Sequence, residues 1–242
     1  MLGWLKKKRL SPGEALITDM HSHLLPGLDD GVKTLEEAEA VVRVLMRLGY
    51  RKLITTPHVM QDHYRNTPET ILGGLEQLRN HLRERNIEVQ VEAAAEYYLD
   101  EYFIRSLESG STPLTFGDGY LLFETNFLSE PLTLNEFIFA VTTRGYRPVL
   151  AHPERYLYLQ DNLERIEDLA NRGVLFQLNL GSLAGFYSRA VQVMAGRLID
   201  RKLVHFLGSD CHNLQHAEGI ARVARSRYFE KAINLRLINH DL

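Results

Sequence analysis

Short strand-like stretches alternate seven times with amphipathic helical stretches along the chain, and this alternation constrains the fold more than any other feature. Runs rich in Val, Ile, Leu and aromatic residues predict strands at 17–20, 52–56, 89–95, 120–124, 148–151, 174–178 and 204–208. Helical stretches are expected at 34–49, 67–86, 100–109, 133–145, 161–172, 188–201 and 214–238. Strands that alternate with helices pair in parallel through crossover connections. We therefore expect an α/β fold, a barrel of seven βα units rather than an open doubly wound sheet.

Three of these helices have recognisable starting signals. Thr34 precedes Glu37, and Thr133 precedes Glu136, by the three residues that separate the members of a capping box. The Thr67-Pro68 pair is typical of a helix that begins with proline in its first turn.

The composition indicates one globular domain. The chain has 242 residues, of which 45% are hydrophobic and 24% charged, and no linker interrupts it. We expect a domain over residues 17–242, preceded by a basic and apolar extension over residues 1–16. Trp4 and Lys6–Arg9 in that extension are expected in a solvated tail or in a short helix at the barrel bottom, with contact to an anionic membrane surface as the alternative.

Charge and cysteine content exclude several classes of protein. A net charge of −3 and a pI near 6.4 give no electrostatic reason for nucleic-acid binding. No apolar run approaches the ~18 residues of a transmembrane helix. The single cysteine, Cys211, excludes an internal disulfide and suits a reducing compartment, so a cytoplasmic protein is expected. Nothing in the sequence predicts an oligomeric state.

Every predicted strand ends in a polar side chain that can bind a metal or form a hydrogen bond. In chain order these are His21 with His23, His58, Glu96, Glu124, His152, Asn179, and Asp210 with His212. A parallel barrel brings the carboxyl ends of its strands to one face, where active sites form. Burying so many imidazoles and carboxylates is costly unless divalent metals take them as ligands. The sequence therefore predicts a metal site at this face.

The first of these strand ends lies in the stretch ITDMHSHLLPGLDDG. In an extended chain Asp19, His21 and His23 point the same way, and two imidazoles aimed into one space indicate a metal. We expect Asp19 to orient one of the imidazoles from behind. On the last strand the same alternation directs His205 and Cys211 away from the site, so both are excluded as ligands, and Cys211 is expected to be a packed side chain.

Five motifs together resemble a known superfamily. They are DMHSHLLPGLDDG, TTPH, AAAEYY, AHPERY and SDCHN, and they are similar to the motif series of the PHP (polymerase and histidinol phosphatase) superfamily. More narrowly, they resemble the bacterial protein-tyrosine phosphatases of the CpsB/CapC/YwqE type, over residues 17–240. The resemblance implies a distorted (β/α)7 TIM-like barrel that holds three divalent metal ions. Manganese is the expected metal, and iron or zinc would also accept these ligands.

The resemblance also implies a ligand set for each metal ion at the matching positions. The first ion would be held by His21, His23, Glu96 and Asp210. The second would share Glu96 and add Glu124 and His152, and the third would take Asp30, His58 and His212.

Arg155, in HPERY, matches a family arginine that is expected near the phosphate and is our first candidate for catalysis and substrate binding. One departure from the family is visible. Members often have an arginine-proline segment after HN, whereas this chain reads LQHAEGIAR. Arg65 or Arg222 is the candidate for a second phosphate-binding arginine, and we expect Arg65 and Tyr98 to contact the substrate.

The implied chemistry is hydrolysis of a phosphate ester. Three divalent ions carry six positive charges, of which four carboxylates cancel four, and the remainder matches a phosphate dianion. The hypothesis is that a bridging water with a lowered pKa attacks phosphorus in line. Asp29, His63 or His216 would supply a proton to the leaving group, and Asp29 is the candidate that we place in the catalytic set.

The resemblance implies a phosphotyrosine substrate on an autophosphorylating tyrosine kinase that controls capsule or exopolysaccharide synthesis. Aromatic residues after the strand ends either form a wall for the phosphotyrosine ring or roof the barrel core, and for most of them the roof is preferred. These residues are Tyr97, Tyr98, Phe127, Tyr156, Tyr158, Phe186 and Tyr187.

Other functions either remain possible alternatives or are disfavoured by the sequence. A small-molecule phosphatase such as histidinol phosphatase would use the same metals, and a metal-binding regulator without catalysis is a further alternative. A carbamate-bridged amidohydrolase needs a lysine at a strand end, where this chain has none, and the absent basic surface disfavours an exonuclease. A cysteine-dependent phosphatase needs an arginine six residues after its cysteine, where Cys211 is followed by Ala217.

Overall fold

The computed structural model describes residues 10–242 and contains all seven predicted strands. Two of the seven are each divided in two, the second at Thr56–Pro57 and the third at Ala94–Ala95. The strands are β1 (Thr18–Asp19), β2 (Lys52–Thr55), β3 (His58–Val59), β4 (Gln90–Ala93), β5 (Glu96–Tyr98), β6 (Tyr120–Glu124), β7 (Arg147–Ala151), β8 (Leu175–Asn179) and β9 (Phe206–Gly208).

The strands form a barrel in which all neighbours run in parallel. One sheet has the order β1-β2-β4, and the other has the order β3-β5-β6-β7-β8-β9. A parallel bridge between Ser22 and Cys211 brings the first strand segment beside the last. Two backbone hydrogen bonds support that contact, from His23 N to Cys211 O (3.0 Å) and from Asp210 N to His21 O (2.8 Å). The predicted α/β, distorted TIM-like barrel is confirmed.

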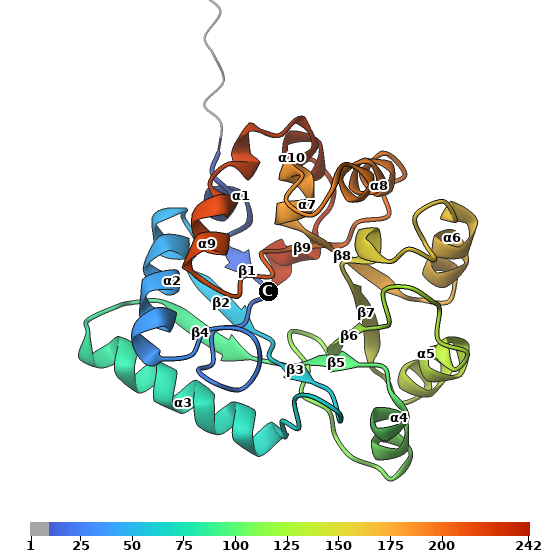
Figure 1. Ribbon diagram of the computed structural model, residues 1–242, viewed down its shortest axis with the longest axis horizontal. Coiled ribbons are helices and arrows are strands. Elements are labelled where there is room, and N and C mark those ends of the chain that lie inside the picture. The colour runs from blue at the N-terminus through green and yellow to red at the C-terminus, as the bar shows by residue number, and fades with distance from the viewer. Residues whose placement is uncertain (1–9) are drawn as a thin grey trace, which may run out of the picture.

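Helices surround the strands, as Figure 1 shows. The α-helices are α1 (Pro12–Leu16), α2 (Leu35–Arg47), α3 (Pro68–Glu84), α4 (Glu101–Glu108), α5 (Leu134–Thr143), α6 (Leu163–Asn171), α7 (Leu180–Ala184), α8 (Arg189–Asp200), α9 (Leu214–Ile220) and α10 (Arg227–Ala232). Short 3-10 helices lie at Pro153–Arg155 (η1), Val223–Arg225 (η2) and Ile238–Asp241 (η3). The single helix expected over 214–238 is wrong, because η2 and the extended Ser226 separate α9 from α10.

Two of the three predicted helix starts form, although the capping box expected at Thr34 is only half made, because Glu37 Oε2 accepts from Lys33 N. The Thr34 hydroxyl accepts a hydrogen bond from Glu37 N (3.2 Å), and the Thr67 hydroxyl accepts one from Thr70 N (3.3 Å). The predicted capping box at Thr133 does not form. Thr133 has φ −86° and ψ 0°, inside a turn closed by the bond from Leu134 N to Pro131 O, and its side chain makes no capping bond.

Apolar side chains fill the barrel below the carboxyl ends of the strands. Met20, Ile54, Leu122, Val149 and Phe206 come from five strand segments and are fully buried in one cluster. A larger cluster packs the outer surfaces of the strands against the helices, and it includes the buried Cys211. Because the interior is packed, the polar residues at the strand ends lie over a solid apolar floor.

The chain before the first strand is partly described. Residues 11–16 pack on the barrel through α1, where a Cβ on Gly13 would lie 2.1 Å from Tyr50 N, so only glycine fits. Trp4 and Lys6–Arg9 lie outside the described residues. Among residues 10–242 no helix has the length and apolar content needed to cross a bilayer.

Candidate metal centre

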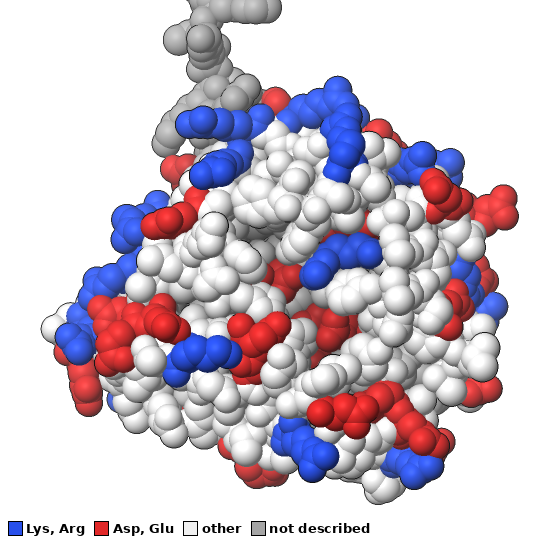
Figure 2. Space-filling view, viewed as in Figure 1, with Lys and Arg blue, Asp and Glu red and all other residues white. Residues whose placement is uncertain are grey.

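The structure brings all nine expected ligands together at the carboxyl ends of the strands, and we call them the ligand cluster. They line or underlie a cavity of about 410 Å³ whose wall also includes Phe127, Arg155, Tyr187, Asn213 and His216. Figure 2 shows a hollow at the centre of this face, with Asp and Glu atoms on its floor and basic atoms at its rim. The ligand cluster consists of His21, His23, Asp30, His58, Glu96, Glu124, His152, Asp210 and His212.

The set expected for the first metal converges at the buried end of the cavity. Glu96 Oε2 lies 3.2 Å from His21 Nε2 and 3.5 Å from His23 Nε2. Asp210 Oδ1 lies 3.6 Å from His21 Nε2 and 3.5 Å from His23 Nε2. Two carboxylate oxygens and two imidazole nitrogens therefore face one point, which suits a divalent cation.

Glu96 also faces the set expected for the second metal. Its Oε1 lies 3.1 Å from His152 Nε2, and Glu124 Oε2 is 3.9 Å from the same nitrogen. His58 joins this set, because its Nδ1 lies 3.2 Å from Glu96 Oε2 and 3.1 Å from Glu124 Oε1. Sequence reasoning placed His58 only with the third metal.

The third set lies nearer the cavity mouth. Asp30 Oδ1 is 3.5 Å from His58 Nε2 and 3.4 Å from His212 Nε2, and His23 is near enough to join them. His58 thus presents one nitrogen to each of two sets, with Nδ1 toward Glu96 and Nε2 toward Asp30.

Hydrogen bonds behind three of the imidazoles fix which nitrogen can bind a cation. Nδ1 contacts an oxygen in each case: Gln177 Oε1 at 2.8 Å for His21, Asp29 Oδ2 at 2.7 Å for His23, and the Asp210 backbone O at 3.0 Å for His212. An Nδ1–H that donates to these oxygens leaves the Nε2 lone pair free toward the carboxylates.

The buried atoms of the cluster meet the chemical demands of a metal site. His58 Nδ1 is buried without a hydrogen-bond partner among residues 10–242, although two carboxylate oxygens face it. Burial alone would lower the pKa of His58, but the charges of Glu96 and Glu124 raise it to about 9. Burial would raise the pKa of Glu96, but His21 and His58 hold it well below its usual range. The negative carboxylates that hold a proton on His58 would also attract a divalent cation. The residues therefore fit the metals that the resemblance implies.

Two members of the ligand cluster have backbone conformations that favour glycine. His152 has φ 35° and Asp210 has φ 51°, and each directly follows or closely follows the end of its strand. A left-handed residue at such a point turns the chain, and for a non-glycine residue it costs of order 1 kcal/mol. Their occurrence at two ligand positions is typical of a functional site.

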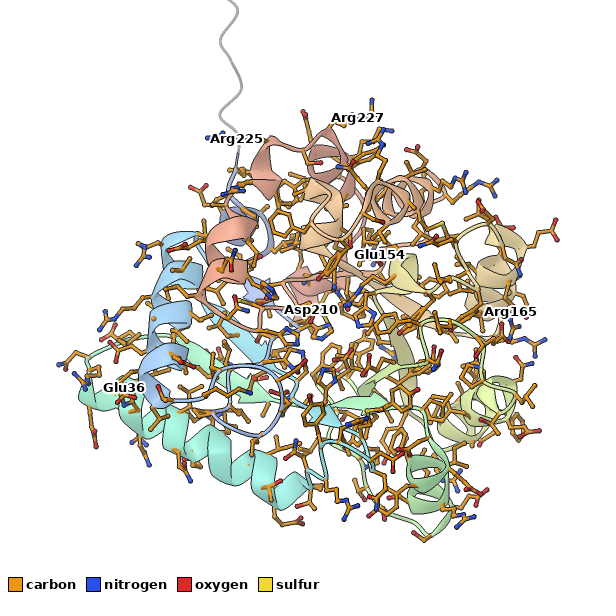
Figure 3. The ribbon with its side chains drawn as sticks, viewed as in Figure 1. Glu36, Glu154, Arg165, Asp210, Arg225 and Arg227 are labelled. Atoms are coloured by element: carbon orange, nitrogen blue, oxygen red, sulfur yellow. The ribbon has the colours of Figure 1, made fainter. Side chains whose placement is uncertain are left out.

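Arg155 lies at the cavity wall with its guanidinium between two aromatic rings. Its Cζ is 4.7 Å from the Phe127 ring centre and 4.5 Å from the Tyr187 ring centre. Its Nη1 donates to Asp210 Oδ2 at 3.1 Å, and 26% of the side chain is exposed. The buried preceding residue, Glu154, accepts from Asn179 N and the Ser182 hydroxyl, which ties η1 to the start of α7; Figure 3 labels Glu154 and Asp210 near the centre.

The remaining candidates occupy different places. Asp29 lies behind the cluster, where its carboxylate contacts His23 and accepts hydrogen bonds from Gly31 N and His58 N. This position suits the orientation of His23 better than proton donation to a leaving group. Arg65 is exposed and donates to Gln61 O beside a separate small cavity, so the structure does not bring it to the ligand cluster. Tyr98 is half-buried on β5, outside the cavity wall.

Of the other candidate proton donors, His216 lines the cavity and His63 is exposed on the β3–α3 connection. Arg222 lines a neighbouring cavity. Among the aromatic residues, Phe127 and Tyr187 line the ligand-cluster cavity, whereas Tyr97 and Tyr156 are buried in the core as the roof interpretation expected.

Two supporting roles differ from those expected. Asp19 does not orient an imidazole; it accepts hydrogen bonds from Ser209 N and the Ser209 hydroxyl, joining β1 to the segment after β9. Gln177 orients His21 instead, and sequence reasoning missed it. The available signal was its alternation with Asn179, since both side chains fall on the same face of β8.

Comparison with known proteins identifies the family of the chain. The profile of the CpsB/CapC family, described as capsular polysaccharide synthesis, matches residues 17–234. The tyrosine-protein phosphatase YwqE of Bacillus subtilis is 29% identical over 197 residues, which cover 81% of this chain and 78% of YwqE.

A solved structure of related proteins also aligns with nearly the whole chain. A crystal structure from work on B. subtilis YwqE and Streptococcus pneumoniae CpsB, described there as unique metal-dependent tyrosine phosphatases, aligns with a TM-score of 0.78 and 28% identity. It covers 90% of this chain and 94% of its own. A histidinol phosphate phosphatase of Lactococcus lactis aligns with a TM-score of 0.50, 11% identity and coverage of 86% and 91%, which shows a shared fold alone. The expected resemblance is confirmed, and the chain belongs to the CpsB/CapC family of capsular polysaccharide synthesis proteins.

Proposed function

We propose that this protein is a metal-dependent protein-tyrosine phosphatase with its active site at the ligand cluster. The observation that carries the proposal is the position of Arg155, which contacts Asp210 in the wall of the cavity that six of the nine candidate ligands line. We assign three divalent cations to the cluster, with manganese as the preferred ion. The similarity to YwqE supports the choice of phosphotyrosine.

Different residues are proposed to bind the cations, to bind the phosphate and to contact the leaving group. When bound, divalent cations supply positive charge for the phosphate oxygens and lower the pKa of water. His21, His23, Glu96 and Asp210 would hold one cation, Glu96, Glu124 and His152 a second, and Asp30, His58 and His212 a third, with the single lone pair of a neutral His58 imidazole serving one cation only. Arg155 donates to phosphate oxygens from the cavity wall, and because the Phe127 and Tyr187 rings hold its guanidinium, little order is lost on binding. His216, which also lines the cavity, is the candidate proton donor to the leaving group.

The substrate is proposed to be phosphotyrosine on a tyrosine kinase that controls capsule or exopolysaccharide synthesis. The family description supports the link to capsule synthesis. The exposed faces of Phe127 and Tyr187 give the phosphotyrosine ring an apolar surface beside the phosphate site. We place the reaction in the cytoplasm, where a kinase has access to ATP.

The test is turnover of three substrates by protein loaded with manganese. A phosphotyrosine peptide and p-nitrophenyl phosphate should be hydrolysed much faster than histidinol phosphate, and a chelator should abolish the activity. His152→Ala should remove turnover, whereas His63→Ala, at an exposed histidine outside the cavity, should retain it.

The other outcomes identify the alternatives. Preference for histidinol phosphate would replace the proposal with a small-molecule phosphatase. Metal binding without turnover of any of the three substrates would indicate a regulator that recognises its partner without hydrolysis.

A further inference from the structure

A second cavity of about 440 Å³ adjoins the ligand-cluster cavity. Tyr187, Asp210 and His216 line both cavities, so the two share one wall. Beyond that wall the second cavity is lined by residues of the α7–α8 connection, of α9 and of the segment after α9, including Phe186 and Arg222. A group that is held at the ligand cluster therefore has neighbouring space in this direction.

The Phe186 ring is fixed by close packing although the residue is 43% exposed. A Cβ on Gly219 would lie 2.7 Å from the ring, and a Cβ on Gly181 would lie 3.0 Å from it. The ring thus packs between two glycines, one on α9 and one on α7, where any larger residue would displace it. An aromatic face that is exposed yet fixed in place can bind a ligand with little loss of side-chain entropy.

Arg222 supplies an uncompensated charge to the same cavity. Its guanidinium is exposed and makes no hydrogen bond or ion pair with any residue between 10 and 242. Glu218, on the same wall, is also without an ion pair within that range. An unpaired arginine at a cavity rim attracts a carboxylate, and the nearby glutamate weakens that attraction.

We propose that the second cavity binds the residues that flank the phosphotyrosine in the substrate protein, with an apolar side chain on Phe186 and an acidic side chain at Arg222. This inference rests on the proposed function, because it requires the phosphotyrosine to occupy the adjoining cavity. A polypeptide fits the arrangement since it carries side chains on both sides of the reacting residue, which a small phosphate ester lacks.

The experiment compares kcat/KM for a phosphotyrosine peptide flanked by glutamates with that for the same peptide flanked by glutamines, and with p-nitrophenyl phosphate. The protein should prefer the glutamate peptide by about threefold to fivefold, the upper part of the range for an exposed ion pair. Arg222→Gln should abolish this preference, and Glu218→Gln should increase it. Phe186→Ala should lower the ratio of peptide to p-nitrophenyl phosphate turnover by about fivefold.

Arg225→Gln is the matched control. Arg225 is an exposed arginine in η2, which Figure 3 shows at the edge of the molecule, away from Asp210, and it does not line the second cavity. It should leave both ratios unchanged. Equal loss of preference in Arg222→Gln and Arg225→Gln, or unchanged ratios in Arg222→Gln and Phe186→Ala, would overturn the inference. No turnover of p-nitrophenyl phosphate or either peptide by the unaltered protein would contradict the proposed function instead.

Discussion

Asp29 Oδ2 lies 2.7 Å from Nδ1 of His23, and this contact directs the other imidazole nitrogen toward Glu96 and Asp210. Burial would raise the pKa of Asp29, but the charge of His23 and its hydrogen bond hold it well below the usual range. Asp29 therefore stays ionised. One carboxylate orients a side chain of the ligand cluster and also accepts from the His58 backbone, so it contacts residues of more than one of the three expected sets.

The first prediction concerns Asp29→Asn. The amide can present its NH2 group to His23 Nδ1, which would move the proton to Nε2 and remove the lone pair that faces the cation. Loss of such a supporting carboxylate lowers metal affinity or activity by about 10-fold to 100-fold. Titration of the metal-free protein with manganese, followed by kcat/KM measurement, checks this effect. Asp62→Asn, at an exposed carboxylate, should bind manganese normally, and equal affinity in both variants would rule out the orienting role.

The second prediction concerns Arg155→Lys. A lysine keeps the positive charge but loses the planar group that stacks between Phe127 and Tyr187 and donates in parallel to two oxygens. We expect kcat/KM for p-nitrophenyl phosphate to fall by about 100-fold, equivalent to about 2.7 kcal/mol of transition-state stabilisation. Inhibition by inorganic phosphate should weaken in parallel. Arg201→Lys, in an exposed pair with Glu167, serves as the control, and wild-type activity in the Arg155 variant would remove this residue from the phosphate site.

The sequence was sufficient to predict the barrel and the strand-end members of the ligand cluster because both depend on local patterns, whereas Asp30, in the connection after the first strand, came from the family resemblance. Each strand is a short apolar run with a polar residue at its end, and parallel pairing then brings those ends together whatever the helices do. His21, Glu96, His152 and Asp210 could thus be placed on one face from a single sequence.

Features that depend on tertiary contacts were not predictable in the same way. The turn at Thr133 depends on the backbone bond from Leu134 N to Pro131 O, which the Thr-x-x-Glu pattern does not reveal. The break in the second strand falls at Pro57, whose nitrogen has no hydrogen to donate to a neighbouring strand, and this signal was overlooked. Arg65 appeared suitable as a phosphate ligand by charge alone, yet the β3–α3 connection carries it to another cavity. His58 was expected with one metal set and contacts two, because sequence does not reveal which ring nitrogen faces which carboxylate.

The third prediction concerns the pH dependence of stability and His205. Burial lowers the pKa of His205 below its usual 6.5, and Phe176 N donates to its Nδ1 at 3.0 Å. The unfolded chain then binds the proton more readily than the folded protein, so the stabilising contribution is complete above pH 6.5 and is lost as the pH falls below it. His205→Asn keeps an acceptor for Phe176 N but does not titrate. Urea unfolding at pH 7.5 and 5.5 should show a smaller loss of stability for this variant than for the wild type, whereas His240→Asn, at an exposed histidine, should behave like the wild type.

The fourth prediction concerns the effect of metal removal on thermal stability. The ligand cluster is preformed by contacts that lie behind it, such as Gln177 to His21 and Asp29 to His23, so we expect the metal-free protein to remain folded. A cation that binds only the folded state at 100 times its Kd adds about 2.7 kcal/mol to the free energy of unfolding. For a domain of this size each kcal/mol raises Tm by about 2–4 °C, so a chelator should lower Tm by about 5–10 °C per tightly bound ion.

Thermal unfolding followed by circular dichroism checks this value, and manganese in excess should restore the original Tm. His21→Ala removes a ligand of the most buried set, and it should reduce the shift caused by the chelator. An unchanged Tm on chelation of protein shown by elemental analysis to contain metal would mean that the ions bind elsewhere, because ions held by these buried side chains must be lost when the barrel unfolds.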